Sequence, residues 1–486
     1  MMEFMFLNLA SAPGIRERIP TRWQHAENGK SVMNLISLED VPHYRKWRVS
    51  MSRVIDIDRS RVRNFFHFQR DPLGFLVETA DKGDVVSLRT GTFQSTYVVN
   101  SPEFIRALLV THESGLVKGR SSNVLRRTVG DGLLTSEHNQ HKQQRKYMQP
   151  AFYKERINSY ARTVVEEAGK LADGLQNGSV IDVHEEMMQL TLSIITKTMF
   201  HASVDEDKQR LSDAVDTTIV QTAGTLFSPL ILPLGFPTRG NRNHKHAISE
   251  LETMIYNTLN RAKQQEIPDD SLLGMLLETK DEDGNPIPDE EIRDQMMTML
   301  LAGHETTASL LTWVFFLLSK HPEAREKVLA EVKQCHKPYS FETFMQLRYT
   351  KQVIEETLRL YPPAWIILRE SRQSINILGE TFPDKSSFLI SPYAIHRNPA
   401  VFQDPHSFQP ERFSPGRSYE PYTYFPFGGG PRGCIGSRFA MMEAVLILAV
   451  LIEKAEFRHK EKEIIPEPLV SLRVKGGLKV SVELNG

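Results

Sequence analysis

The feature that most constrains the fold is one apolar stretch of about thirty residues, which begins at Pro288 and ends near His321. It reads PDEEIRDQMMTMLLAGHETTASLLTWVFFLLSKHP, and its opening proline and acidic residues suit the first turn of a helix. Its length is well beyond that of an ordinary helix, and its centre is apolar nearly all round. We therefore expect a helix that runs through the core, with the rest of the fold packed around it.

The centre of this expected helix also holds a polar segment. Gly303 and His304 are followed by Glu305, Thr306 and Thr307, although apolar residues lie on both sides. Glycine inside a helix costs about 1 kcal/mol relative to alanine, and a buried carboxylate costs more unless it is paired or protonated. We expect a polar, flexible break with a functional role. The alternative is a solvated kink in which threonine hydroxyl groups bond back to helix carbonyl groups.

Strand patterns occur near both ends of the chain. The β-branched runs at 84–91 and 95–100 predict a hairpin. Near the C-terminus, residues 470–484 form two alternating runs joined across a glycine pair at 476–477, which is a strong hairpin pattern. Small sheets are therefore expected before and after a helical region.

Helical periods dominate the rest of the chain. One early helix is expected over 65–83, ended by Gly83, and apolar residues recur at three- and four-residue spacing from about Pro102 onward. The predicted fold class is therefore mainly α with small β-sheets (α+β). Because no linker rich in proline, glycine or serine divides the chain, we expect a single large domain.

Composition and charge exclude several functional classes. Hydrophobic residues make up 40% and charged residues 24% of the 486-residue chain, as in soluble globular proteins. The net charge of −1 does not favour a nucleic-acid partner. The N-terminal apolar run is short, contains Glu3 and Asn8 and lacks a basic leader. We therefore expect no transmembrane segment and a cytoplasmic protein.

A second apolar stretch, residues 226–237, contains three prolines, which exclude a membrane-spanning helix. It either packs as a connection between helices or forms an apolar lid or channel wall. The sequence favours neither, and whether this stretch contacts a membrane stays open.

The chain has only two cysteines, Cys335 and Cys434, so a framework of disulfides is excluded. Cys434 lies in the glycine-rich segment FPFGGGPRGCIG, at 425–436. Three of its glycines satisfy the G-x-G-x-x-G pattern of dinucleotide-binding loops. However, the segment follows SYEPYTYFPF rather than a buried strand, and Pro431 lacks a backbone amide. A dinucleotide-binding role is therefore excluded.

Cys434 leaves two chemical interpretations. As a nucleophile it would need a nearby base, which the sequence does not identify. A lone cysteine cannot build a tetrahedral zinc site, and HETTA has Ala308 where a zinc-protease motif has its second histidine. One cysteine can, however, be the sole protein ligand of a haem iron. In that case the glycines let the backbone approach the macrocycle, Phe427 shields the sulfur and Arg432 pairs with a propionate.

Three motifs are similar to those of the cytochrome P450 family, the haem-thiolate monooxygenases, and the segment HKQQR resembles that of soluble bacterial-type members. The family's haem loop, F-x-x-G-x-R-x-C-x-G, is matched in full by Phe427, Gly430, Arg432, Cys434 and Gly436. Its distal-helix pattern, (A/G)-G-x-(D/E)-T-(T/S), is matched by Ala302, Gly303, Glu305, Thr306 and Thr307. Its E-x-x-R pattern with a partner arginine is matched by Glu356, Arg359 and Arg412.

The resemblance covers roughly Pro72 to the C-terminus, and implies one P450-type domain over 46–486 and an N-terminal extension over 1–45. The long central helix would lie over a haem b (iron protoporphyrin IX), with Cys434 as the axial metal ligand. HKQQR places His141 where the family often has tryptophan, so its role is less defined than that of Arg145. The implied cofactor contacts are Cys434, Phe427, Arg432, Arg145, His141, Arg369, Gly303 and Gly436.

The resemblance also implies how the site works. Thr306 would hold dioxygen and a water, Glu305 would help to deliver protons, and Gly303 would open the helix so that dioxygen fits. A buried charge network would hold the haem loop, and its members are Glu356, Arg359 and Arg412. The candidate substrate contacts are apolar, which implies a lipophilic substrate, and they are Leu301, Ala302, Trp365 and Ile366.

The implied activity is the insertion of one oxygen atom from O2 into a lipophilic substrate, by hydroxylation or epoxidation. The chain has no flavin or ferredoxin motif, so electrons are expected from a separate ferredoxin, flavodoxin or reductase. A candidate basic docking face for this donor comprises Lys142, Arg145, Lys146 and Arg438. Two alternatives remain: a peroxide-using or rearranging haem-thiolate enzyme, which the pair Glu305 and Thr306 disfavours, and a non-catalytic haem-thiolate sensor.

Overall fold

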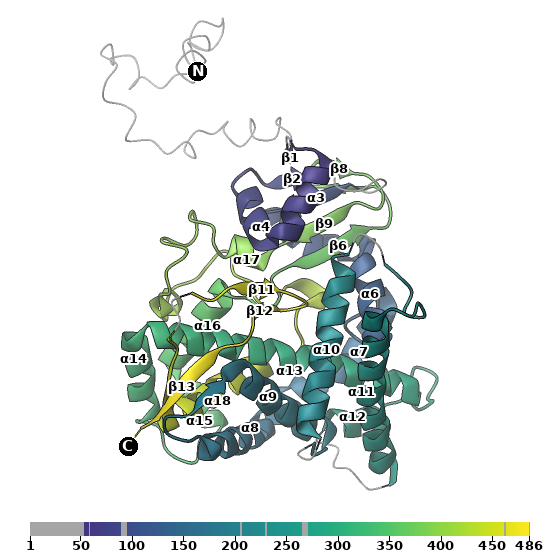
Figure 1. The fold of residues 1–486 in the computed structure, drawn as a ribbon. Coiled ribbons are helices and arrows are strands. Elements are labelled where there is room, and N and C mark those ends of the chain that lie inside the picture. Colours follow the sequence, from purple (N-terminus) through teal and green to yellow (C-terminus); the bar gives the residue numbers. More distant parts are fainter. Residues whose placement is uncertain are drawn as a thin grey trace, which may run out of the picture. The chain divides into compact units, whose positions relative to one another are not determined.

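The structure, a computed structural model, describes residues 53–57, 59–88, 95–204, 207–228, 231–264, 271–460 and 463–485. The predicted extension over 1–45 and its boundary with the domain lie outside the described residues. Residues Arg53–Gly486 form one compact unit. Helices make up most of this unit, and short strands gather beside them (Figure 1). The prediction of a mainly α fold with small sheets is confirmed.

The elements of the described residues have the following bounds. The helices are α3 (Arg61–Arg70), α4 (Pro72–Ala80), α5 (Pro102–Arg106), α6 (Arg120–Val129), α7 (His138–Met148), α8 (Lys154–Gly174), α9 (Val183–Phe200), α10 (Lys208–Leu226), α11 (Arg239–Gln264), α12 (Leu272–Glu278), α13 (Asp289–Lys320), α14 (Pro322–Val332), α15 (Phe341–Gln346), α16 (Arg348–Leu360), α17 (Pro392–Ile395) and α18 (Ser437–Lys454). The strands are β1 (Val54–Asp56), β2 (Val85–Ser87), β3 (Thr96–Val99), β4 (Leu116–Val117), β5 (Val180–Asp182), β6 (Ile367–Ser371), β7 (Ile375–Ile377), β8 (Glu380–Phe382), β9 (Ser387–Ile390), β10 (Ala455–Arg458), β11 (Pro466–Pro468), β12 (Leu472–Val474) and β13 (Lys479–Leu484).

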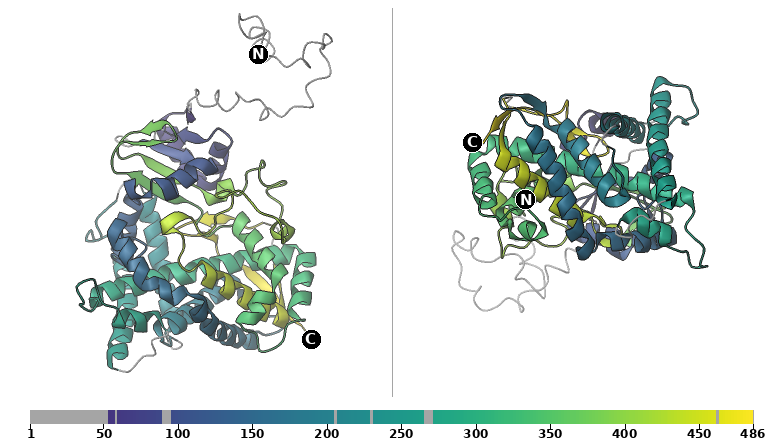
Figure 2. Two further views of the ribbon diagram at one scale, coloured as in Figure 1. Left: turned by 180° about the vertical axis from the view of Figure 1, so that it is seen from behind. Right: turned by 90° about the horizontal axis from the view of Figure 1, so that it is seen from below.

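The long helix predicted from the sequence is α13, which spans 32 residues. Asp289, Glu290 and Glu291 occupy its first turn, where carboxylates favour the positive end of the helix dipole. The helices α9, α11, α16 and α18 pack against it, and Figure 1 shows it running through the helical part. From behind, Figure 2 shows α18, in yellow-green, beside the blue α8. No helix of the described residues has both the length and the apolar character needed to cross a membrane.

The expected break in the centre of α13 is absent, because the helix is continuous from Asp289 to Lys320. Thr306 Oγ1 donates to the carbonyl oxygen of Ala302 at 2.9 Å, and Thr307 Oγ1 donates to that of Gly303 at 3.4 Å. The threonine hydroxyl groups therefore bond back to the helix, as the alternative interpretation proposed. Because these hydroxyl groups have hydrogen-bond partners within the helix, the polar segment stays helical inside the core.

The largest sheet has the strand order β1-β2-β3-β9-β6-β4. Its β2 and β3 pair antiparallel, with Val85 opposite Val99, so the predicted pairing of these two runs is confirmed. Their connection lies outside the described residues. Strand β9 pairs parallel with β3 and antiparallel with β6, which brings the segment after α16 to the N-terminal strands. The strand that carries Arg369 is thereby anchored in the sheet.

The early helix predicted over 65–83 is wrong in its extent, since two helices, α3 and α4, occupy this region. Asp71 ends the first helix and caps the second, because its side chain accepts the Gly74 amide at 2.9 Å. Pro72 follows in the first turn, where its missing amide costs nothing. The sequence Asp-Pro is therefore a helix boundary here, and α4 ends before Gly83.

The predicted C-terminal hairpin is also wrong. Strand β12 pairs with β11, whereas β13 lies between β10 and β5 in another sheet. Gly476 and Gly477 do form a turn, with φ angles of 77° and 81°. The chain reverses at this glycine pair as expected, but each strand pairs with a partner from elsewhere in the sequence.

Gly477 offers a test of this turn. A Cβ on Gly477 would approach Asp182 Oδ2 to 2.0 Å, and Asp182 caps α9 by accepting the His184 amide at 2.9 Å. We expect Gly477→Ala to lower the free energy of unfolding by about 2–4 kcal/mol, because left-handed strain adds to a displaced cap. Urea unfolding followed by circular dichroism measures the change.

Gly476→Ala is the matched control. Its φ is 77°, but a Cβ there would meet open space. We expect only the strain of the left-handed conformation, about 1–2 kcal/mol. Equal losses in the two variants would contradict the steric role of Asp182.

Candidate active site

One accessible strip interrupts the buried centre of α13. Between Asp294 and Leu318 every residue is buried except Ala302, Gly303 and Thr306, which are half-buried. Residues separated by one, three and four positions share one face of a helix. Because α13 runs through the core, this strip is the part of its centre that protein side chains leave uncovered.

Cys434 is accessible although protein surrounds it. The residue is exposed, yet burial raises the pKa of its thiol, while the Gly436 amide and the Arg145 guanidinium oppose this increase. The Cys434 amide donates to the carbonyl oxygen of Phe427 at 2.9 Å, which closes the loop around the sulfur. The thiol is therefore accessible at a position that the surrounding protein desolvates.

Two of the loop glycines make room for neighbouring protein. Gly430 has a φ of 67°, and a Cβ there would lie 2.0 Å from the carbonyl oxygen of Leu109. A Cβ on Gly429 would lie 2.5 Å from the ring of Tyr422. The expectation that the loop glycines clear space for a macrocycle is therefore wrong for these two, which let the loop pack against Leu109 and Tyr422.

Basic side chains gather at the loop. Arg145 Nη1 donates to the carbonyl oxygen of Gly433 at 2.7 Å, so α7 is tied to the loop. Arg432 pairs with Glu113 and with Glu137, each at 2.6 Å. The two carboxylates hold Arg432 in place, and its predicted propionate contact stays a prediction.

Two further cations, the buried Arg369 and the half-buried Lys118, lie beside Arg432. Burial, followed by the charges of Arg432 and Arg369, lowers the pKa of Lys118 to about 7. Burial and Arg432 likewise lower the pKa of Arg369 to about 10, and Arg369 Nε has no hydrogen-bond partner among the described residues. Buried like charges that depress one another's pKa favour the binding of an anion.

His141 belongs to the same cluster and is 5% exposed. Burial, followed by the charges of Arg432 and Lys118, lowers its pKa to about 3, so the imidazole is neutral at pH 7. Sequence reasoning missed Lys118, because the segment VKGR carries no motif. Only its position beside Arg369 and Arg432 marks it as part of the site.

These residues fit a haem-thiolate site. Such a site needs an accessible sulfur, cations for two propionates and open space over the ring. Cys434 supplies the sulfur, the cluster around Arg369 and Lys118 supplies the cations, and the half-buried strip of α13 borders the space. The donor set is therefore chemically matched to haem.

Gly303 makes room for a neighbouring helix, whereas the sequence predicts that it makes room for dioxygen. A Cβ there would lie 2.9 Å from Ile195 Cδ1 on α9, which is closer than such contacts allow. The glycine therefore lets α9 approach α13 closely. Because the helix is unbroken, the prediction that Gly303 opens it is wrong, although the residue still lies on the half-buried strip.

Glu305 is held in a buried ion-pair network. Its carboxylate, 2% exposed, accepts a hydrogen bond from Arg473 Nε at 2.8 Å and another from the Ser471 hydroxyl. Arg473 also pairs with Asp216 on α10, whose side chain is 51% exposed. Sequence reasoning missed Ser471 and Arg473, since both lie in the segment read as a simple hairpin.

The predicted charge network around Glu356 is present. Arg359 donates from Nε and Nη2 to the two carboxylate oxygens of Glu356, at 2.7 and 2.8 Å. Its Nη1 donates to the carbonyl oxygens of His396 and Pro405, at 2.9 and 2.7 Å. Arg412 Nε lies 3.4 Å from the same carboxylate. These bonds tie α16 to the segment that precedes the Cys434 loop.

The predicted substrate contacts divide into accessible and buried residues. Ala302 and Ile366 are half-buried, and Leu301 is 9% exposed. Trp365 is 1% exposed and donates from Nε1 to the carbonyl oxygen of Leu469 at 3.0 Å. The structure therefore places Trp365 in the core, where it offers no surface to a substrate. The half-buried neighbours that sequence reasoning missed are Ile367 and Leu368.

Comparison with known proteins decides the family. A family model described as Cytochrome P450 matches residues 60–480. The chain belongs to the cytochrome P450 family. Members of this family are haem-thiolate proteins, and this P450 is a monooxygenase, an oxidoreductase that acts on lipophilic compounds.

Several relatives resemble this P450 over most of their length. Cyclooctatin synthase of Streptomyces melanosporofaciens is 35% identical and covers 83% of the chain and 89% of its own length. Pentalenene oxygenase of Streptomyces avermitilis is 31% identical, and the match covers 81% of the chain and 88% of the relative's own length. Cyclooctat-9-en-7-ol 5-monooxygenase of Streptomyces melanosporofaciens is 32% identical, and the match covers 80% of the chain and 86% of the relative's own length.

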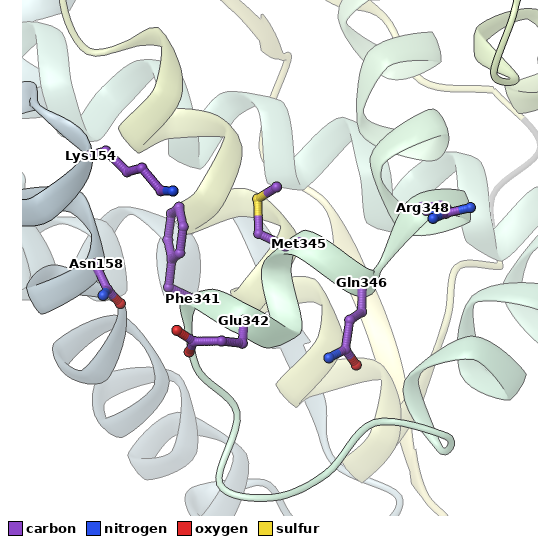
Figure 3. Close-up of a pocket in the computed structure, with 7 residues that line it drawn as sticks. All are labelled: Lys154, Asn158, Phe341, Glu342, Met345, Gln346 and Arg348. Carbon is purple, nitrogen blue, oxygen red and sulfur yellow. The ribbon is translucent and has the colours of Figure 1, made fainter.

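This P450 also has a surface pocket of about 690 Å³ that contains none of the predicted site residues. Figure 3 shows Phe341 and Met345 of α15 between Lys154 of α8 and Arg348 of α16. Glu342 also lines the pocket, so both charge signs are present. The pocket contributes no residue to the candidate active site.

The pair formed by Glu305 and Arg473 yields a stability test. We expect Arg473→Met to lower the free energy of unfolding by about 3–5 kcal/mol, because the buried Glu305 carboxylate loses its partner. Urea unfolding of the purified protein measures the loss.

The double variant Glu305→Gln/Arg473→Met separates the pair from each residue's own packing. We expect it to be more stable than Arg473→Met, because the amide leaves no unpaired charge in the core. Strictly additive losses would contradict a direct coupling between the two side chains.

Proposed function

We propose that this P450 binds haem b through the Cys434 thiolate and inserts one oxygen atom of O2 into a C–H or C=C bond of a lipophilic substrate. The observation that carries the proposal is the accessible thiol of Cys434, enclosed by protein and tied to a buried cluster of cations. The half-buried strip of α13, with Thr306, completes the site.

Each group of residues has a proposed role toward the cofactor. Cys434 is the iron ligand, and the Gly436 amide and Arg145 stabilise its thiolate form. The carbonyl oxygen of Phe427 accepts the Cys434 amide, and its side chain is proposed to shield the sulfur from water. The propionate partners are Lys118, His141, Arg145, Arg369 and Arg432.

Bound haem supplies the activation of dioxygen and the transfer of one oxygen atom to the substrate. The chain supplies position and proton control. Thr306 presents a hydroxyl on the accessible strip, where it exchanges hydrogen bonds with dioxygen and water. Glu305 helps to deliver protons when its bonds to Ser471 and Arg473 rearrange. Buried apolar side chains around the strip exclude bulk water.

The proposed substrate is a cyclic alkene or an unsaturated cyclic alcohol. Ala302, Ile366, Ile367 and Leu368 offer half-buried apolar surface without a charged partner for the substrate. Relatives that cover most of the chain carry the names pentalenene oxygenase and cyclooctat-9-en-7-ol 5-monooxygenase. Apolar contacts of this kind recognise shape and size more strongly than polar groups.

Electrons come from a separate ferredoxin, flavodoxin or reductase in this proposal. Lys142, Lys146 and Arg438 are exposed, so they remain available to an acidic partner surface. Arg145 is bonded inward to Gly433 and is not part of an exposed face. The proposed docking face therefore consists of the three exposed cations.

The carbon monoxide spectrum tests the cofactor and its ligand. We expect the reduced protein under carbon monoxide to show the red-shifted absorption band of a thiolate-bound haem, and Cys434→Ala to abolish it. Cys335→Ala is the matched control, because Cys335 lies beyond α14 and its thiol donates to the carbonyl oxygen of Glu331, away from the candidate active site. A band that survives in Cys434→Ala would overturn the proposal.

The role of Thr306 is tested by the amount of product formed per electron pair consumed. We expect Thr306→Ala to lower the product formed per electron pair by about tenfold or more, since a positioned proton-transfer group contributes about 10²–10⁴-fold. Thr306→Ser keeps the hydroxyl group and should retain most of the coupling. Similar coupling in the alanine variant and the unaltered protein would remove Thr306 from the mechanism.

A further inference from the structure

A groove of about 480 Å³ lies beside the Cys434 loop, and the proposed function assigns it no role. Its volume is that of a small-molecule site. Glu355 of α16 is the only charged residue among the described residues that line it. Most of the wall is apolar or aromatic, and the large side chains in it are Tyr422, Tyr424, Phe425, Phe427 and Met441. The groove therefore combines one carboxylate with several aromatic rings.

The Glu355 carboxylate lacks a partner within the protein. The residue is half-buried, and its side chain makes no hydrogen bond or ion pair with another described residue. Burial raises its pKa to about 7, and Lys351, one turn earlier on α16, opposes this increase. The Lys351 ammonium group, however, lies over the ring of Phe344, 3.9 Å from the ring centroid. A cation in the groove would supply the partner that the ionised carboxylate lacks.

The aromatic wall is fixed against the helix that carries this acid. The Tyr424 hydroxyl group donates to the backbone carbonyl oxygen of Glu355 at 3.0 Å. The ring of Tyr424 also packs against that of Phe413, with 4.7 Å between the ring centroids. Both contacts hold the ring beside the carboxylate without any ligand, so a bound molecule would not have to order this side chain.

Tyr422 lines the groove in a strained backbone conformation. Its φ angle is 70°, in the left-handed region that bulky residues rarely adopt. Its ring packs against Gly429, where a Cβ would lie only 2.5 Å from the ring. The protein therefore provides a glycine that accommodates the strained tyrosine. Strain of this kind persists only where the surrounding structure holds it, and it is concentrated at ligand-binding and other functional sites.

We propose that this groove binds a free organic ammonium ion, with its positive charge toward Glu355 and its carbon substituents against the rings of Tyr422 and Tyr424. Aromatic rings attract cations through their negative faces, and quaternary ammonium ions are bound in this way. An anion would be repelled by Glu355, and a neutral ligand would leave the carboxylate without a counter-ion. A metal ion would need more ligands, and no group of three suitable side chains occurs in the part of the chain that the structure describes.

A free ion suits the groove better than a lysine side chain of a partner protein. The carboxylate is half-buried inside a volume typical of small-molecule sites. The cations proposed for docking the electron donor, Lys142, Lys146 and Arg438, favour an acidic partner surface rather than a lysine-rich one. The proposed site goes beyond the oxygen chemistry of the proposed function and does not depend on it.

Calorimetric titration of the holoenzyme with choline tests the site. Choline is a quaternary ammonium ion whose nitrogen has no lone pair, so it cannot bind the haem iron through that atom. Its neutral isostere, in which a tert-butyl group replaces the trimethylammonium group, has the same shape without the charge. We expect one choline to bind per chain and the isostere to bind about tenfold more weakly or less, because only choline attracts the Glu355 carboxylate.

Glu355→Gln removes the charge and keeps the shape of the side chain. We expect this variant to bind choline about tenfold more weakly and the isostere as before. Glu420→Gln is the matched control, because Glu420 is an exposed acid that precedes the groove segment in sequence and does not line the groove. Its choline affinity should equal that of the unaltered protein.

A second readout is the Tm of the holoenzyme, which a ligand that binds only the folded chain raises. Choline should raise the Tm of the unaltered protein and of Glu420→Gln more than that of Glu355→Gln. Equal affinities for choline and the isostere, or an unchanged choline affinity in Glu355→Gln, would overturn the proposed site. So would the absence of both a binding heat and a rise in Tm in the unaltered protein. The carbon monoxide band tests the proposed function separately.

Discussion

The burial of α13 is the constraint on which the rest of the structure depends. A helix of 32 residues with an apolar circumference needs cover on all sides, and α9, α11, α16 and α18 provide much of it. Each polar group at its centre must then be paired, because an unpaired one would be costly in the core. Glu305 pairs with Arg473, and the hydroxyl groups of Thr306 and Thr307 bond back to carbonyl oxygens of the same helix.

A second constraint is electrostatic. Burial, followed by the charges of Arg432 and Arg369, lowers the pKa of Lys118, and an anion beside these cations would oppose this effect. A dianionic cofactor that binds only the folded chain would relieve this repulsion and stabilise the fold by mass action. The Cys434 loop is supported independently, because Arg145 holds Gly433 and the network around Glu356 holds the preceding segment. Protein contacts alone therefore hold the loop that carries Cys434, without a contribution from the cofactor.

The candidate site was predictable where its residues are close in sequence. The haem loop and the polar centre of α13 each place several functional groups within a short segment, so spacing alone indicates their chemistry. Residues brought in from distant segments were not predictable: Lys118 and Arg473 carry no motif, and their charges matter only because burial places them beside Arg369 and Glu305. Trp365 is an error of the opposite kind. The sequence predicts it as a substrate contact, but the structure buries its side chain in the core.

The long core helix, the lone cysteine of the glycine-rich loop and the mainly helical class follow from the sequence alone, because local spacing and hydrophobicity carry that information. Strand pairing and the surroundings of the buried acids depend on the tertiary structure. Gly476 and Gly477 specify a reversal in the chain, but competition among distant strands chose the partners of β12 and β13. Likewise, Glu305 and Glu443 have the same side chain, and their opposite environments arise from burial with or without an arginine. Such long-range effects depend on three-dimensional neighbours that no local pattern records.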